Sequence, residues 1–357
     1  MPYEKWPTNN TRLWSGGKID LRIDPWCNYD VSASEDELTM ETRPTSLTRG
    51  MMFGALAAIG YTAANVFLRS VSDYNSAWVS GVKSLWTFSL CIPWLVAPWL
   101  KGQRVFPSAK MTLWLVLAAV MGQFGGNLAF QFSLRQIGLA ISVPLCLGTM
   151  ITSSAIVGSV WGREPLRRSV LISIPVFLLA ITLLSSGRMV ETAQKDLDVE
   201  NGSLIWVIVG CCCAALSGLA YSILGFVIRR CTHDEIPIVT PMAIVAMVGT
   251  VGLCSLGAEQ LGVEGVSAIP LQAWLGMSLA GVVNAAAFYA LTVSLKILPV
   301  LYVHLVNSSQ VAMAAIAGAL IFGEPVTLLI GIGVVLTVLG FLVMSSESQA
   351  KASTAAD

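Results

Sequence analysis

Ten long apolar runs constrain what this chain can fold into more than any other feature. A run of about 20 apolar residues matches the hydrocarbon core of a bilayer, where backbone groups must be hydrogen-bonded within the segment. Charged residues make up 12% of the chain, against about 25% in soluble proteins. We therefore expect an all-α integral membrane protein with ten transmembrane helices, at residues 50–70, 75–99, 111–134, 139–161, 169–186, 203–228, 237–257, 271–294, 299–322 and 327–345.

The two ends of the chain are polar and lack such runs. Residues 1–47 show no periodicity, and they lack the apolar stretch of a signal peptide. We expect a disordered cytoplasmic tail there and a second cytoplasmic tail at residues 347–357. The alternative for the first tail is that the protein starts at Met40.

Lysine and arginine residues predict how the spans are oriented. With the N-terminus inside, connections that carry residues such as Arg104, Arg168 and Arg230 lie inside, and few basic residues, among them Lys195, lie outside. Cytoplasmic loops are the ones that carry an excess of Lys and Arg. We therefore expect a multi-pass protein of the cell membrane with both termini in the cytoplasm.

One motif occurs twice, about 160 residues apart. Residues 158–168 read GSVWGREPLRR, and residues 318–328 read GALIFGEPVTL. At the same offset Tyr61 corresponds to Tyr221. The chain therefore contains a duplicated unit of five spans.

The duplicated unit predicts an inverted repeat. Five spans are an odd number, so the second copy enters the membrane with the opposite orientation, as in many secondary transporters. We assign the first repeat to residues 48–190 and the second to residues 203–346. Arg69 in the first repeat corresponds to Arg229 in the second.

The Glu-Pro step in each motif has a local structural interpretation. The residue before Pro is disfavoured in the α region, and Pro suits the first turn of the next helix. A Glu at the start of that helix is favoured by the helix dipole. We interpret six residues as structural turns, with a gating or substrate role for either Glu as the alternative: Gly162, Glu164, Pro165, Gly323, Glu324 and Pro325.

Polar side chains form stripes on several spans. Gln123, Asn127 and Gln131 are spaced four residues apart, which places them on one face of a helix. Such amides either hold helices together or line a cavity. We expect the substrate-binding residues to be Tyr61, Asn65, Lys83, Gln123, Asn127, Gln131, Tyr221, Asn284, His304, Asn307 and Gln310.

Two of these residues carry or can carry a charge. Lys83 lies within the second span, where an ammonium group needs water, a partner or a ligand. The alternative is that its side chain extends to the nearer membrane interface. His304 is either a neutral, packed residue or a binding and titrating one.

The ten spans, the two halves of five and the turns WGREP and FGEP resemble the drug/metabolite transporter superfamily, specifically its EamA-like family. The resemblance covers about residues 48–345, and the first turn departs from the pattern by the extra residue Arg163. It implies a cytoplasmic-membrane transporter of small metabolites, often an exporter. It also implies a central cavity lined by the first four helices of each half, with the fifth helices at the periphery, where they would form the contact of any homodimer.

The residues favour one class of solute. Amides, tyrosines and a single Lys suit an amino acid or another small zwitterionic or weakly anionic metabolite. No Asp or Glu lies in mid-span, so the usual carboxylate proton relay is missing and a facilitator or exchanger is favoured, with proton coupling through His304 left open. We expect no cofactor, no metal and, since the net charge is zero, no nucleic acid partner.

Two other classes of function are alternatives. A non-transporting sensor or scaffold could use the same fold. An intramembrane serine hydrolase would pair Ser217 of ALSGLA with His304, but Ala215 stands where that motif has Gly. We therefore expect no enzyme.

The orientation can be tested with single cysteines in a cysteine-free chain. The loops at 101–110 and 229–236 are predicted inside, and those at 187–202 and 258–270 outside. We expect an impermeant thiol reagent added outside intact cells to label a cysteine at position 195 and not one at position 104. The reverse pattern would contradict the orientation and the inverted repeat.

Overall fold

The computed structural model describes residues 44–161, 202–232, 236–298 and 300–324, most of 327–339, and residues 175, 176, 179 and 183. The helices described belong to the unit of residues 43–357. Most of the predicted first tail, most of the predicted fifth span and the last residues of the chain lie outside the described residues.

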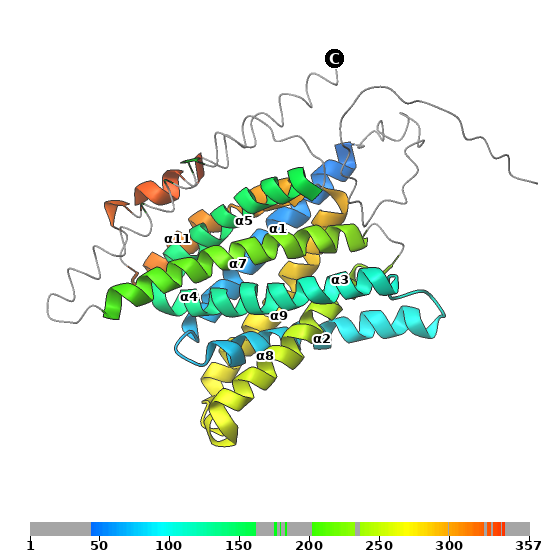
Figure 1. Ribbon diagram of the computed structural model, residues 1–357, viewed down its shortest axis with the longest axis horizontal. Helices are drawn as coiled ribbons and strands as arrows, with labels where there is room; N and C mark the ends of the chain where they lie inside the picture. The colour runs from blue at the N-terminus through cyan, green and yellow to red at the C-terminus, as the bar shows by residue number, and fades with distance from the viewer. Residues whose placement is uncertain are drawn as a thin grey trace, which may run out of the picture. The chain divides into compact units, whose positions relative to one another are not determined.

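Every secondary-structure element in the described part is a helix, and no strand occurs there (Figure 1). Within the residues that the structure describes, seven helices are long and apolar enough to cross a membrane. This confirms the predicted all-α membrane class, while the count of ten stays a prediction. The elements are α1 (Pro44–Ser70), α2 (Ser76–Leu100), α3 (Ala109–Val120), η2 (Met121–Leu128), α4 (Ala129–Ile137), α5 (Leu139–Trp161), α7 (Gly202–Thr232), α8 (Val239–Ser267), α9 (Leu271–Ile297), α10 (Val300–Asn307) and α11 (Gln310–Phe322).

Local sequence explains where several helices begin and end. The Asn75 side chain accepts a hydrogen bond of 2.9 Å from Trp78 N and so caps α2, which satisfies an N–H group that has no partner inside the helix. Gly138 separates α4 from α5 with a φ of 76°, a conformation that glycine adopts at little cost.

Two boundaries differ from the prediction. Helix α1 begins at Pro44, inside the stretch assigned to the tail, because Pro suits the first turn of a helix. Helix α8 continues to Ser267, through residues expected to form an outer loop. It changes direction at Gly262, whose φ is 67°. This kink lies within the stretch 258–270 that the sequence predicted as an outer loop.

The helices pair mainly across the two halves of the chain. Helix α1 packs along α9, α2 packs along α8, and α7 packs against α5 and against the segment of α3, η2 and α4. Figure 1 shows α5, α7 and this segment lying side by side. The first half therefore does not form a bundle of its own, and the centre of the protein is the interface between the halves.

Glycines let some of these helices approach closely. A Cβ atom on Gly60 of α1 would lie 2.8 Å from the Cβ of Ala287 in α9, and one on Gly81 of α2 would lie 2.7 Å from Cys254 N in α8. Small residues at such crossings bring backbones together in a membrane. Both helix pairs therefore pack closely because Gly60 and Gly81 have no side chain.

Polar and apolar residues are distributed as a membrane bundle requires. Large apolar side chains such as Trp94, Trp99 and Leu320 are exposed, whereas Lys83 and Gln123 are buried, with 4% and 2% exposed. Ionisable residues within spans face the interior of a bundle and not lipid. The buried polar side chains therefore mark the region where a functional site must be sought.

Candidate functional site

A cavity of about 150 Å³ lies between the two halves of the chain. An apolar cavity of about this volume holds a benzene-sized molecule, so a small organic solute fits. Helices α1, α2, α4, α5, α7, α8, α9, α10 and α11 and the η2 segment contribute to its wall. Of the predicted substrate-binding residues, those that line the cavity are Tyr61, Asn65, Lys83, Gln123, Asn127, Tyr221, Asn284, His304, Asn307 and Gln310.

Lys83 donates a hydrogen bond of 2.5 Å from Nζ to Asn127 Oδ1. Tyr221 donates to the same oxygen from its hydroxyl group, at 2.7 Å. One amide oxygen thus joins α2, η2 and α7, and both halves of the chain take part. Lys83 points into the bundle and not toward the membrane interface, which argues against the alternative in which its side chain extends to lipid headgroups.

Gln123 fixes the orientation of the Asn127 side chain. Asn127 Nδ2 donates to Gln123 Oε1 at 2.6 Å, and Gln123 Nε2 donates to the Val245 carbonyl in α8 at 2.8 Å. Ser84 Oγ also donates to Gln123 Oε1, at 3.3 Å. Because its amide nitrogen is already engaged, Asn127 presents its oxygen to Lys83.

The η2 segment is a π-helix within the third span. Such segments are rare and often occur at functional sites. Its glycines admit α7, since a Cβ on Gly126 would lie 2.6 Å from Tyr221 Cε1 and one on Gly122 would lie 2.6 Å from Leu224 Cδ2. This close approach places the Tyr221 hydroxyl within hydrogen-bond distance of Asn127.

Gln131 is not among the lining residues. Its Nε2 donates to the Leu68 carbonyl in α1 at 3.1 Å. The π-helix η2 lies between Gln123 and Gln131, so the i, i+4 spacing of a regular α-helix does not keep Gln131 on the cavity face. Of the three amides, Gln123 and Asn127 line the cavity, whereas Gln131 joins the third span to α1.

The second half contributes amides near a break in the ninth span. Helix α10 ends at Asn307 and α11 begins at Gln310, and Gln310 Nε2 donates to Asn307 Oδ1 at 2.8 Å. On α9, Asn284 Nδ2 donates to Thr87 Oγ1 at 3.2 Å. Interrupted helices at the repeat interface are typical of binding sites in transporters.

His304 has no protein partner for either ring nitrogen among the described residues, although it is only 2% exposed. The space beside it comes from α7, where a Cβ on Gly225 would lie 3.4 Å from His304 Nε2. Buried polar groups without partners need an explanation, such as water or a ligand. A lining residue in this state is available to a solute.

The sequence pattern missed the apolar walls of the cavity. They include Phe130, Met150, Leu224 and Phe288, which nothing in the sequence separates from the other apolar residues of the spans. Thr87 was also missed, and it accepts the hydrogen bond from Asn284. The cavity is therefore polar at Lys83 and around His304 and apolar over much of the remaining wall.

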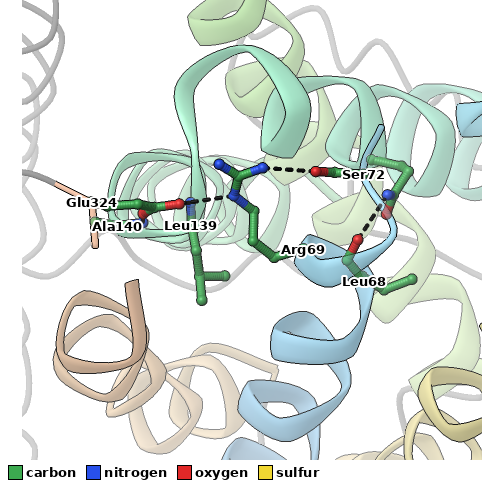
Figure 2. Close-up of polar contacts among 7 residues, drawn as sticks. Leu68, Arg69, Ser72, Leu139, Ala140 and Glu324 are labelled. Carbon is green, nitrogen blue, oxygen red and sulfur yellow. Dashed lines mark hydrogen bonds and ion pairs between the residues drawn. The ribbon is translucent and has the colours of Figure 1, made fainter. Parts of the chain in front are cut away.

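Glu324 makes contacts that its local interpretation did not predict (Figure 2). Its carboxylate accepts hydrogen bonds from Leu139 N at 2.8 Å and Ala140 N at 2.9 Å. It also forms an ion pair with Arg69, with 2.8 Å between Nε and Oε1. Glu324 thus caps N–H groups of α5 in the other half, a contact that the local interpretation did not include.

The other predicted turn residues are less informative. Gly323 follows α11 with a φ of 62°, the αL conformation that commonly ends a helix, and Glu324 N donates to the Gly318 carbonyl at 3.0 Å. Pro325 and the first copy of the turn, Gly162, Glu164 and Pro165, lie outside the described residues.

The described residues give no support to metal or hydrolase chemistry. They contain no group of three or more His, Cys, Asp or Glu side chains that could hold a metal ion. Ser217 Oγ donates to the Ala214 carbonyl at 2.7 Å and lies 3.1 Å from Cys146 Sγ. The Ser–His hydrogen bond of a hydrolase is absent, since both nitrogens of His304 lack a partner in this part of the chain.

Residues 208–346 match the model of the family described as "EamA-like transporter family". This match confirms the predicted resemblance over residues 208–346, which lie in the second half of the chain. A solved structure described as "Crystal structure of protein" is similar with a TM-score of 0.55 and 15% identity, over 83% of this chain and 96% of that chain. It is one of 28 solved chains that match, and at this identity the likeness concerns the fold alone. No curated protein matches.

The close contact between η2 and α7 gives a test with a matched control. We expect Gly126→Ala to lower the free energy of unfolding by about 1–3 kcal/mol, the usual effect of overpacking, because the new Cβ would meet the Tyr221 ring. Gly125→Ala should have little effect, since a Cβ there would lie 3.4 Å from Ala220 Cβ, an ordinary contact. Thermal unfolding of the purified proteins in detergent measures the difference, and equal stabilities would contradict the packing described.

Proposed function

We propose that this EamA-like chain is a secondary transporter that moves a small zwitterionic or weakly anionic solute, such as an amino acid, across the cytoplasmic membrane. It works by alternating access and acts as an exporter or exchanger. The observation that carries the proposal is a buried lysine in a cavity between the two halves, held by a neutral amide oxygen. Among the described residues that line the cavity, Lys83 is the only Lys, Arg, Asp or Glu. It is therefore the charged group that a solute in the cavity would contact.

The chemistry of Lys83 supports an anionic group on the solute. A lysine at the centre of a bilayer costs about 2.5–3.5 kcal/mol on insertion scales. A lysine at this depth therefore indicates that its charge contributes to function. Hydrogen bonds between charged groups are stronger than those with a neutral partner. A carboxylate can therefore compete with Asn127 for the ammonium group.

The rest of the cavity supports a solute with further polar groups. His304 offers two ring nitrogens without a protein partner in the described part of the chain, and a neutral imidazole donates at one nitrogen and accepts at the other. Asn307 and Gln310 lie on the same wall. Phe288 and Met150 provide apolar surface for the remaining part of the molecule.

The arrangement of helices supports two halves of five spans each, related by an inverted repeat. The pairing of α1 with α9 corresponds, when the halves are exchanged, to the pairing of α7 with the segment of α3, η2 and α4. The packing of α7 on α5 corresponds in the same way to the packing of α1 on α10 and α11. Related halves can expose one central site to either side of the membrane.

The central prediction concerns Lys83. We expect Lys83→Met to insert and fold, since it removes a costly charge and keeps the length of the side chain. We expect its apparent affinity for the solute to fall at least tenfold, which corresponds to about 1.4 kcal/mol. Counterflow into liposomes, measured with a panel of radiolabelled amino acids and small organic acids at matched protein levels, tests this.

Two further variants complete that experiment. Asn127→Leu should also reduce counterflow, because it removes the oxygen that positions the ammonium group and the Tyr221 hydroxyl. Leu179→Ala changes an exposed apolar residue of the predicted fifth span and should leave counterflow unchanged. If Lys83→Met transports as well as the parent protein does, the proposed binding site is wrong.

A further inference from the structure

The ion pair between Arg69 and Glu324 lies directly beyond one end of the cavity. On α1, Tyr61 and Asn65 line the cavity, and Arg69 follows Asn65 by four residues, which places it one turn further along the same face. On α5, Val143 lines the cavity, and Leu139 precedes it by one turn. Helices α1 and α5, which both line the cavity, therefore each contact the Glu324 carboxylate one turn beyond it.

The cluster joins the two halves of the chain. Arg69, Leu139 and Ala140 belong to the first half, and each donates a hydrogen bond to Glu324 of the second half. Arg69 also donates from Nη1 to Ser72 Oγ at 2.7 Å, and its guanidinium group lies 5.7 Å from the centre of the Phe322 ring. Glu324, just beyond the end of α11, thus links that end to the end of α1 and the start of α5.

The surroundings of Glu324 are shaped to hold the carboxylate. A Cβ on Gly138 or on Gly318 would lie 2.6 Å from one of its oxygens. Gly138, between α4 and α5, lies beside Oε1, and Gly318, within α11, lies beside Oε2. The carboxylate thus sits in a fitted position, with 11% of the side chain exposed.

We infer that Arg69 and Glu324 are gating residues, which close one end of the cavity in the conformation described. Opening of that end requires Glu324 to leave Arg69 and the first N–H groups of α5. The inference rests on the proposed transport function. In the predicted orientation this end faces outward.

Thiol labelling tests the gate without a solute. A single cysteine replaces Asn65, one turn inside the gate, in a cysteine-free chain. An impermeant thiol reagent is then added separately to each side of membrane vesicles. We expect Arg69→Gln and Glu324→Gln each to increase the labelling rate at least tenfold from one side only, whereas Arg69→Lys, which keeps the charge, should label at a rate close to that of the parent.

A second variant dislodges the carboxylate without changing a charge. Gly318→Ala places a Cβ against Glu324 and should increase labelling from the same side, whereas Gly331→Ala, where a Cβ has open space, should not. Arg135→Gln is the control for loss of a positive charge, since Arg135 is exposed at the end of α4 near the same end of the bundle.

The outcomes separate the gate from the stability of the fold and from transport. A loosened fold would increase labelling from both sides, which would contradict a gating role. Rates within twofold of the parent on both sides for all three variants would also overturn the inference. Labelling needs no transport, so the gate can fail in this test while counterflow succeeds, and the reverse also holds.

Discussion

The hydrogen bond between the Lys83 ammonium group and Asn127 Oδ1 is the contact on which the centre of this structure depends. An ammonium group inside a bilayer needs an acceptor, and the acceptor must itself be oriented. Gln123 orients Asn127, and the Val245 carbonyl orients Gln123. Tyr221 brings α7 to the same oxygen, so one amide organises helices from both halves of the chain.

Two cationic side chains in this protein have opposite kinds of partner. Lys83 meets a neutral amide in the cavity, whereas Arg69 meets a carboxylate that two backbone N–H groups also hold. A neutral partner can be displaced by an anion, but a charged one with three donors is held firmly. The first arrangement suits a site for a solute, and the second suits a contact that keeps one end of the bundle closed.

The sequence predicted the elements better than it predicted their partners. Helix α5 begins at Leu139 and α9 at Leu271, as the apolar runs indicated. A segment that crosses the bilayer must be apolar, so its ends are visible in the sequence. The π-helical turn and the break between α10 and α11 were not predicted, since both lie inside continuous apolar runs. Gln131 lies off its expected face because the π-helical turn before it changes the register of the span.

The role of Glu324 shows most clearly why tertiary contacts escaped prediction. The Gly-Glu-Pro pattern indicated a turn, and Gly323 does end α11. The N–H groups that Glu324 caps, however, belong to Leu139 and Ala140, about 185 residues earlier in the chain. Only the packing of α11 on α5 brings the two together, and no local pattern encodes that contact.

The central claim is that one cavity between the halves is exposed to each side of the membrane in turn. Ala246 of α8 lines the cavity and is only 2% exposed, so a single cysteine at this position reports access to the cavity itself. We expect an impermeant thiol reagent to modify Ala246→Cys from either side in separate experiments on sealed vesicles of known orientation. Modification from one side only, or from neither, would contradict alternating access through this cavity.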